Sequence, residues 1–323
     1  MNRRDALRAI LRIGGAGAAL AAGWGVVRQL DGLVPAGRAG RLAAHTRLGM
    51  GTVVTVNAAD PSPARAEDAL AAAFAALDRL EPLLTRFDPA APVAVLNDQG
   101  RLDGPPPALL EVLDLARDAH RATAKAFDPT VLPVLAYVQD SCAAGRYPDP
   151  REVAARRSLV GLDRVAWSPR RVEFSRPGMA LTLDGVAKGY IVDAMAAALR
   201  GAGVRHGLVD AGGDIAAFGG KAEGLPWTVA VRDPADPQGV LEVMELFDGA
   251  CTTSGDYEVF FDPERRYHHI LDPNTGRCPH LAHSATVLAD TAAHADALST
   301  ALLVLGPAGR DLVHGRAQRV ILG

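Results

Sequence analysis

The chain has 323 residues, of which 49% are hydrophobic, 22% charged and 5% aromatic, with a formal net charge of −3. This composition describes a globular protein with an ample core, in one large domain or two modest ones. The weakly acidic balance argues against a nucleic-acid partner, and none is expected. Three widely spaced cysteines, Cys142, Cys251 and Cys278, form no CxxC pair and no zinc pattern, so no chemistry is assigned to them.

The first residues predict an export signal. Arg3-Arg4 precede an uncharged run, Ile13–Val27, that is too short and too rich in Gly and Ala for a comfortable transmembrane helix. Twin arginines before a weakly apolar run are typical of a Tat signal, whereas an amphipathic surface helix would not explain the Gly-Ala run. We therefore expect residues 1–36 to be a Tat-type signal and the mature protein to be periplasmic. An uncleaved signal would anchor it close to the membrane.

The rest of the chain, residues 48–323, mixes strand and helix patterns. Helices are expected over Ala64–Leu80 (ended by Pro82), Pro105–Thr123, Asp184–Arg200 and Thr291–Leu305. Strands are expected over Leu48–Asn57, Arg164–Trp167, Arg171–Phe174, Met179–Leu183, Gly207–Asp210, Ile215–Phe218, Trp227–Arg232, Leu241–Phe247, Tyr257–Phe261, Tyr267–Leu271 and Ser284–Ala289. Strands outnumber crossover helices, which excludes a doubly wound parallel sheet and predicts an α+β fold.

The stretch Thr182–Asp193, TLDGVAKGYIVD, combines a strand end with a helix start. Asp184 suits a helix N-cap, Gly185 lets backbone approach a ligand, and Lys188 follows in the first turn. A glycine, a helix N-terminus and a lysine together form a natural anion site. Taken alone, such a stretch is more often an ordinary turn with a capping Asp and a solvated Lys.

A pair of oxygen-bearing residues marks the last long helix. Asp296 and Thr300 lie four apart, so they share one face of a helix that is otherwise Ala and Leu. A carboxylate on an apolar helix needs a partner, and a carboxylate with a hydroxyl suits Mg²⁺ better than zinc. The alternative is a Thr hydroxyl bonded to its own helix and an Asp that reaches solvent.

Two further motifs precede that helix. The sequence Thr252–Asp256 is expected to be a hydroxyl-rich turn, whose hydroxyls and N–H groups suit phosphate oxygens, although many such turns bind nothing. His268-His269 then leads into Leu271-Asp272. The histidine pair is weak evidence for zinc, because no third ligand lies at a usable spacing.

Taken in order, these pieces resemble the ApbE family, the FAD:protein FMN transferases, from about Leu48 to the C-terminus. Each motif alone is weak, and it is their order along the chain that makes the resemblance specific. The matching segments are Met50-Gly51-Thr52, Phe87-Asp88-Pro89 with Asn97, Ala126–Val131, Asp184–Tyr190, Ala211–Ile215, Thr253-Ser254-Gly255, His269–Gly276 and Ala295–Gly306. The resemblance implies an ApbE-like, T-fold-related α+β domain with mixed or antiparallel sheets and packed helices.

The resemblance also implies a site for FAD, the substrate, and for Mg²⁺. The FAD-binding positions would be Met50, Phe87, Ala126, Phe127, Asp128, Thr182, Asp184, Lys188, Thr253, Ser254 and Leu271. Gly185, Asp296 and Thr300 would hold Mg²⁺, and His269 would lie beside the pyrophosphate. The chain departs from the family pattern at Thr182, commonly Asp, at Asp184, commonly Gly, and at Phe87, commonly Tyr. A carboxylate has therefore moved by two residues.

The chemistry implied is attack by a Thr or Ser hydroxyl of a target flavoprotein, of a respiratory or electron-transfer type, on the phosphorus next to riboflavin, with AMP leaving. A hydroxyl needs a base, and the sequence leaves Asp296 and His269 as alternatives. Two other functions stay open: hydrolysis of FAD to FMN and AMP, and a non-enzymatic flavin carrier or assembly factor. The segment Asp248–Cys251 lacks the hydroxyl of the family's acceptor motif, so the chain is not expected to modify itself.

Overall fold

The structure is a computed structural model that describes residues 41–221, 224–236 and 239–323. The predicted Tat signal, residues 1–36, lies outside the described residues. Within the described part of the chain, no helix combines the length and apolar character needed to cross a membrane. The N-terminal strand begins at Arg41 and pairs along its whole length, so the folded domain starts ahead of the predicted boundary at residue 48.

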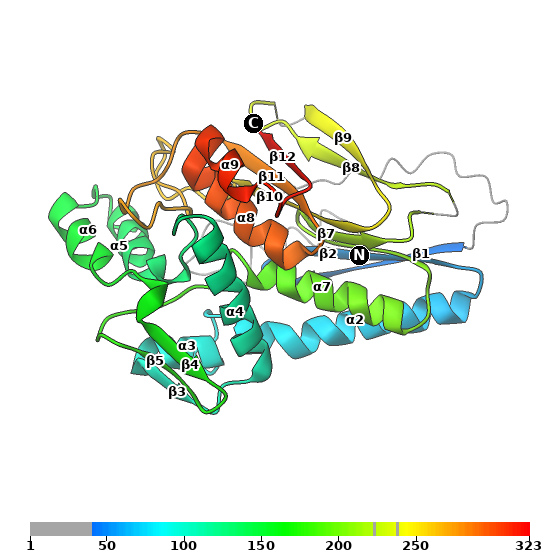
Figure 1. Cartoon of the computed structure of the whole chain (residues 1–323), viewed down its shortest axis with the longest axis horizontal. Coiled ribbons are helices and arrows are strands. Elements are labelled where there is room, and N and C mark those ends of the chain that lie inside the picture. Colours follow the sequence, from blue (N-terminus) through cyan, green and yellow to red (C-terminus); the bar gives the residue numbers. More distant parts are fainter. Residues whose placement is uncertain (1–40, 222–223, 237–238) are drawn as a thin grey trace.

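A seven-stranded sheet in the order β1-β2-β6-β7-β10-β11-β12 forms the centre of the fold, and each neighbouring pair is antiparallel (Figure 1). Its strands are β1 (Arg41–Gly49), β2 (Thr52–Asp60), β6 (His206–Ala211), β7 (Asp214–Phe218), β10 (Gly249–Gly255), β11 (Ser284–Ala289) and β12 (Arg319–Leu322). β1 and β2 are joined at Met50 and Gly51, whose φ angles of 52° and 72° match a two-residue hairpin turn.

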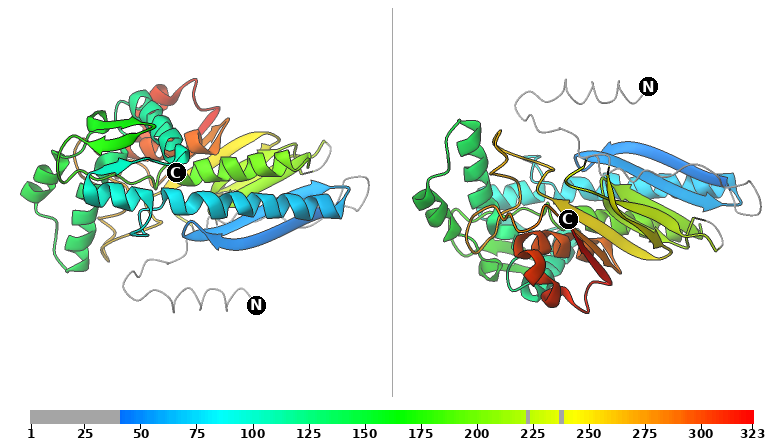
Figure 2. Two further views of the ribbon diagram at one scale, coloured as in Figure 1. Left: turned by 90° about the horizontal axis from the view of Figure 1, so that it is seen from below. Right: turned by 90° about the horizontal axis from the view of Figure 1, so that it is seen from above.

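Three long helices cover one face of this sheet, and a two-stranded ribbon covers the other (Figures 1 and 2). The helices are α2 (Pro63–Leu84), α7 (Ala187–Gly201) and α8 (Ala292–Leu305), and the ribbon pairs β8 (Trp227–Arg232) with β9 (Val240–Leu246). The main apolar core fills the space between sheet and helices, and a second core lies under the ribbon. The site described below lies where α7 and α8 meet the ends of β7 and β10.

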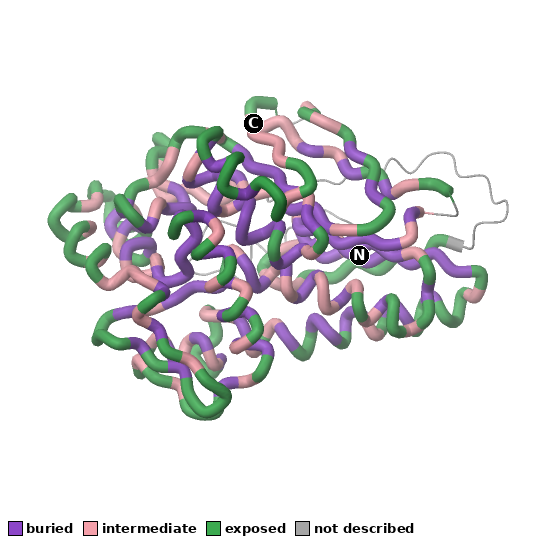
Figure 3. The backbone as a smooth tube through the Cα atoms, in the orientation of Figure 1, coloured by how far each residue is buried: buried purple, intermediate pink, exposed green. Residues whose placement is uncertain are grey.

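The remaining elements surround this core: those that follow α8 lie against its end, and the others lie on the opposite side of the helices (Figure 1). They are α3 (Pro92–Gln99), α4 (Pro107–Ala122), α5 (Leu132–Ala143), α6 (Pro150–Arg157), α9 (Arg310–Val313), the 3-10 turns η1 (Pro129–Val131), η2 (Leu162–Arg164) and η3 (Gly306–Gly309), and a small antiparallel sheet of β3 (Arg101–Asp103), β5 (Arg171–Phe174) and β4 (Val165–Ser168). Figure 3 shows burial concentrated in the main sheet and the faces packed against it, whereas α6 has no buried residue.

The α+β class with antiparallel sheets is confirmed, and several local predictions are wrong. The predicted strand Leu48–Asn57 is a hairpin, because Met50 and Gly51 reverse the chain. The helix α2 continues through Pro82 to Leu84, since a proline in the last turn forfeits little more than one hydrogen bond. The segment Thr252–Asp256 is not a turn: residues 252–255 belong to β10, held between β7 and β11, as β-branched residues favour.

Three other predicted strands are irregular. Met179–Leu183 is extended but pairs with no strand. The side-chain amide of Asn97 takes the place of a neighbouring strand, because it accepts from the Leu181 N–H and donates to the Leu181 carbonyl, each at 2.8 Å. Tyr257–Phe261 and Tyr267–Leu271 share a single bridge, Phe260 with His268. Asp184 is not the helix N-cap either, since α7 begins at Ala187.

Candidate functional site

An unusually close contact between α7 and α8 forms the base of the site. A Cβ atom added at Gly189 would lie 2.3 Å from the Ala292 carbonyl oxygen, so only glycine allows this approach. Asp193, one turn further along α7, accepts hydrogen bonds from the backbone N–H groups of Ala292 and Ala293 at 2.7 and 2.9 Å and thereby caps α8. The contact brings the carboxylate of Asp296 to 3.2 Å from the Gly189 N–H.

Oxygen atoms from three elements converge beside this contact. A Cβ atom at Gly185 would lie 3.0 Å from the Thr300 hydroxyl, and the Ser254 hydroxyl lies 3.3 Å from the same oxygen. Ser254 also bonds the Ser299 hydroxyl at 2.7 Å. Burial raises the pKa of Asp296 to about 7, although the positive charge of Lys188 opposes the shift. A buried carboxylate with nearby hydroxyls is the donor set of a hard cation.

Lys188 supplies positive charge to a group of carboxylates. Its ammonium lies 2.8 Å from Asp214, whose side chain is only 2% exposed. Three further carboxylates, Asp296, Asp210 and Glu258, have pKa values that burial raises and that the Lys188 charge partly lowers again. The pKa of Asp210 is raised to about 6. Lys188 is therefore not the solvated lysine of an ordinary turn.

Arg86 contacts all three positions at which the sequence departs from the pattern that it resembles, Thr182, Asp184 and Phe87. Its guanidinium donates to the Thr182 hydroxyl at 3.2 Å and to the Asp184 carboxylate at 2.9 and 3.0 Å. It also stacks 4.1 Å from the centre of the Phe87 ring, which is 75% exposed. Thr182 and the displaced carboxylate thus share one partner and face the same space.

His269 lies on the connection between β10 and β11. The residue as a whole is half-buried, but its Nδ1 atom is fully enclosed and without a hydrogen-bond partner among the described residues. Burial lowers the pKa of the imidazole to about 4, and the nearby Asp184 carboxylate opposes the shift while Lys188 adds to it. The ring is therefore neutral at pH 7 and belongs to the same electrostatic environment as Asp184 and Lys188.

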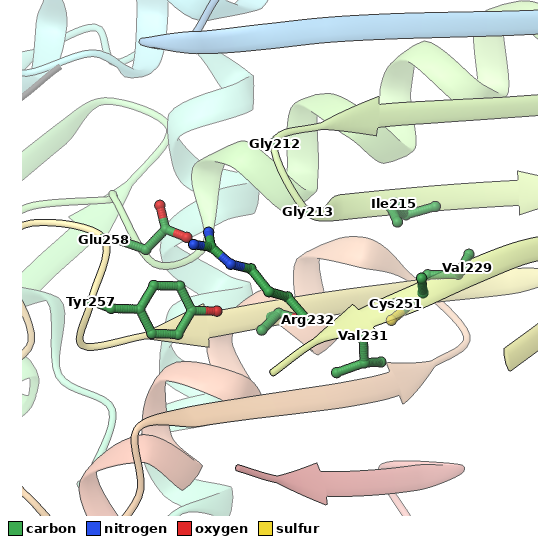
Figure 4. A pocket seen from close by; sticks show the side chains of 11 residues that line it. Gly212, Gly213, Ile215, Val229, Val231, Arg232, Cys251, Tyr257 and Glu258 are labelled. Carbon is green, nitrogen blue, oxygen red and sulfur yellow. The ribbon is translucent and has the colours of Figure 1, made fainter. Parts of the chain in front are cut away.

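A pocket opens beside Glu258, one of the carboxylates near Lys188, between the main sheet and the β8–β9 ribbon (Figure 4). Gly212 and Gly213 form one wall, and Thr253 of β10 lies on another. Figure 4 shows the Glu258 carboxylate pointing toward the Arg232 guanidinium, with the Tyr257 ring beside them. The Thr253 hydroxyl itself bonds that of Thr286 at 2.8 Å.

Of the other predicted FAD-binding residues, only some contact the residues described above. Phe127 and Ala126 are buried, and the Phe127 ring lies 3.2 Å from a Cβ built on Gly185. Met50 donates its backbone N–H to Glu81 at 2.7 Å, in the β1–β2 turn. Leu271 packs in a separate apolar cluster with α5.

The Asp128 carboxylate accepts hydrogen bonds from neighbouring residues of the fold. It accepts from the Thr130 N–H at 2.9 Å, from the Thr130 hydroxyl at 2.5 Å and from the Leu162 N–H at 3.1 Å. Its other close neighbour is His120, with Nδ1 at 3.5 Å. The predicted role of Asp128 in FAD binding thus stays a prediction, and its visible role is to brace η1 against η2.

Five residues of this region were not predicted as site residues: Arg86, Asp214, Arg232, Glu258 and Ser299. Three of them had a sequence signal. Arg86 directly precedes the Phe87-Asp88-Pro89 motif, Asp214 lies inside the Ala211–Ile215 segment, and Ser299 directly precedes Thr300. Arg232 and Glu258 had none, and only the tertiary structure places both on one pocket.

Fold and site define a class: an α+β protein with a central antiparallel sheet and a group of buried and half-buried carboxylates and hydroxyls where two helices meet the sheet. A sequence profile of the ApbE family matches residues 50–322. Among solved structures, the ApbE protein of Thermotoga maritima superposes with a TM-score of 0.79 at 28% identity, covering 87% of this chain and 94% of that one. The chain therefore belongs to the ApbE family, as the motifs predicted.

Two curated relatives are both named FAD:protein FMN transferase. The protein of Vibrio cholerae serotype O1 is 36% identical over 162 residues, which is 49% of this chain and 48% of that protein. The protein of Haemophilus influenzae is 33% identical over 206 residues, which is 61% of this chain and 60% of that protein. These alignments therefore span about half to three fifths of the relatives' length.

Proposed function

We propose that this chain is an FAD:protein FMN transferase, which moves FMN from FAD onto a Thr or Ser of a target flavoprotein and releases AMP. The observation that carries the proposal is the convergence of Asp296, Thr300, Ser254 and the Gly185 backbone next to Lys188. Relatives with this name and the family membership support the reaction class. The target is expected to be a respiratory or electron-transfer flavoprotein.

The residues present fit Mg²⁺. The donors are a carboxylate, hydroxyls and a backbone carbonyl, all hard oxygen ligands. Burial raises the pKa of Asp296 even though the positive charge of Lys188 lowers it, so a bound cation would further stabilise the charged carboxylate. Asp296, Thr300 and the Gly185 carbonyl would hold the ion. When bound, the ion would neutralise charge that develops on the pyrophosphate.

The chain's own residues supply orientation, charge and a proton acceptor. Lys188 places a positive charge beside the buried carboxylates, where an FAD phosphate would meet it. Arg86 holds Asp184 and Thr182 together at the rim. We assign proton acceptance to His269, because its imidazole is neutral at pH 7 and a pyrophosphate close to the ring would raise its pKa toward neutrality.

The test is flavinylation of an acceptor domain, measured by mass spectrometry at saturating FAD across a Mg²⁺ titration. Asp296→Asn keeps the shape but loses the charge, so transfer should fall by about 10²–10³-fold. Thr300→Val should be milder, since water can replace a neutral hydroxyl. Asp68→Asn, on the exposed face of α2, is the matched control and should transfer at the parental rate.

Near-parental transfer by Asp296→Asn would refute the metal assignment and the mechanism with it. His269→Ala should lose as much rate as Asp296→Asn, and a smaller loss would leave His269 with only a steadying role. AMP released at full rate without any acceptor would instead identify an FAD pyrophosphatase. FAD binding without transfer or AMP release would identify a flavin carrier.

We also propose that the protein is exported through the Tat system and acts in the periplasm. The support is the Arg3-Arg4 pair ahead of a weakly apolar run. Replacing both arginines with lysine should leave the protein in the cytoplasm, as read by cell fractionation. Unchanged periplasmic recovery of the double variant would exclude Tat export.

A further inference from the structure

The long connection between β10 and β11 gathers imidazoles around one buried carboxylate that is not part of the proposed Mg²⁺ donor set. Asp256 directly follows β10, His283 directly precedes β11, and their backbones are still bonded, Asp256 N–H to the His283 carbonyl at 3.0 Å. The Asp256 side chain is 7% exposed and lies 2.8 Å from His283 Nδ1. His268 comes from the middle of the same connection and His280 from its last part.

The side chains of Asp256, His268 and His280 can each offer one ligand atom such that all three atoms lie within 4.8 Å of one another. The rings of His268 and His280 meet edge to face, with 5.6 Å between their centres. His268 is fully buried, whereas His280 is exposed. Two imidazoles and a carboxylate are the donors of three-ligand zinc sites, which keep a fourth position open.

We infer that Asp256, His268 and His280 form a second metal site, for a transition-metal dication of the zinc type. His283 orients the ligating carboxylate, as hydrogen-bonded neighbours of metal ligands commonly do. The His268 ring now contacts the Pro279 carbonyl through Nε2 at 3.0 Å and the Ile270 N–H through Nδ1 at 3.3 Å. Ligation exchanges one of these contacts for the ion.

The proposed ion would fix the connection that carries His269. It would join the start of the connection at Asp256 to its middle at His268 and to its last part at His280. His268 is the chain neighbour of His269, so an occupied site would limit how far the His269 backbone moves. The site would thus stabilise the fold and hold a residue of the flavin site without touching FAD.

The decisive experiment titrates Zn²⁺ alone into tag-free, chelator-treated full-length protein, with excess Mg²⁺ present to saturate the oxygen ligands. We expect one Zn²⁺ per chain at micromolar affinity or tighter, and a rise in Tm on binding. His280→Ala changes an exposed residue and should weaken binding at least about 10-fold. His314→Ala changes an exposed histidine that follows α9 and is outside the proposed ligand set, so this variant should bind like the parent.

A second arm separates this site from the proposed transferase site. Asp296→Asn should bind Zn²⁺ with the parental affinity, and Co²⁺ in place of Zn²⁺ should give visible absorption bands that His280→Ala lacks. Absence of Zn²⁺ binding by the parent, equal binding by His280→Ala, or loss of binding in Asp296→Asn would each overturn the inference. None of these outcomes depends on whether the chain transfers FMN.

Discussion

Replacing Gly189 with alanine should force apart the two helices that form the base of the site. The added Cβ would meet the Ala292 carbonyl oxygen at 2.3 Å, its carbon at 2.6 Å and the Ala293 Cα at 2.8 Å. These are backbone atoms, so no side-chain rotation relieves the clash, and α7 and α8 must separate by about 1 Å to restore ordinary contact. The surrounding core is fully packed and resists the shift.

The expected cost follows from two opposing effects. Overpacking of this kind costs about 1–3 kcal/mol, and the upper end applies because backbone must move. Alanine regains roughly 1 kcal/mol through its helix propensity. The net loss of about 2 kcal/mol should lower Tm by about 5 °C. The Gly189 N–H would leave the Asp296 carboxylate, 3.2 Å away, and a misplacement of about 1 Å at reacting groups can reduce the rate of FMN transfer by about 10²-fold.

The matched control lies in the same helix. Gly201 ends α7 and has open space around its Cβ position, so Gly201→Ala should leave transfer unchanged and Tm equal or slightly higher. Tm is measured by thermal unfolding and transfer by acceptor flavinylation. If Gly189→Ala unfolded at the parental temperature and transferred FMN at the parental rate, the close helix contact would have no role in placing Asp296.

Two further predictions concern buried charge. Burial raises the pKa of Asp210 to about 6, so its protonated form favours the fold: this stability is fully present below pH 4 and is lost as the pH rises through 6. Asp210→Asn keeps an acceptor for the Gly213 N–H. In urea unfolding, its free energy of unfolding relative to the parent should rise by up to about 2–3 kcal/mol between pH 4 and 7.5. Parallel pH profiles of the two proteins would exclude the pKa shift. Lys188→Met should lower the free energy of unfolding of the protein by at most about 3–5 kcal/mol, because it leaves the buried Asp214 unpaired. Adding Asp214→Asn should recover part of this loss. A double variant no more stable than Lys188→Met would show that the pair is not coupled.

Local patterns in the sequence predicted several elements together with their bounds. The strands Arg171–Phe174, Trp227–Arg232 and Ser284–Ala289 have the predicted bounds, because alternating apolar residues bounded by turn residues set them directly. The last long helix was likewise readable from its Thr cap and apolar run, as was the shared face of Asp296 and Thr300. The order of short motifs was enough to assign the family and, with it, the class of fold.

Prediction failed where a segment's partner lies elsewhere in the chain. Met179–Leu183 looks like a strand, but its backbone groups are bonded by the side chain of Asn97, which no local pattern can indicate. Asp184 looks like a helix cap, but Arg86 takes its carboxylate from 98 residues away. In both cases a long-range hydrogen bond outweighed a weak local propensity.

The sequence by itself therefore determined the family, the fold class and the residue types of the candidate site. The tertiary structure alone decided which of those residues meet. Gly189 and Asp296 are 107 residues apart, yet close helix packing joins them. Asp256, His268 and His280 have no metal-ligand spacing, yet the pairing of β10 with β11 closes the connection between them. Spacing along a chain fixes contacts only within one helix or hairpin, whereas contacts between elements follow from how the whole core packs.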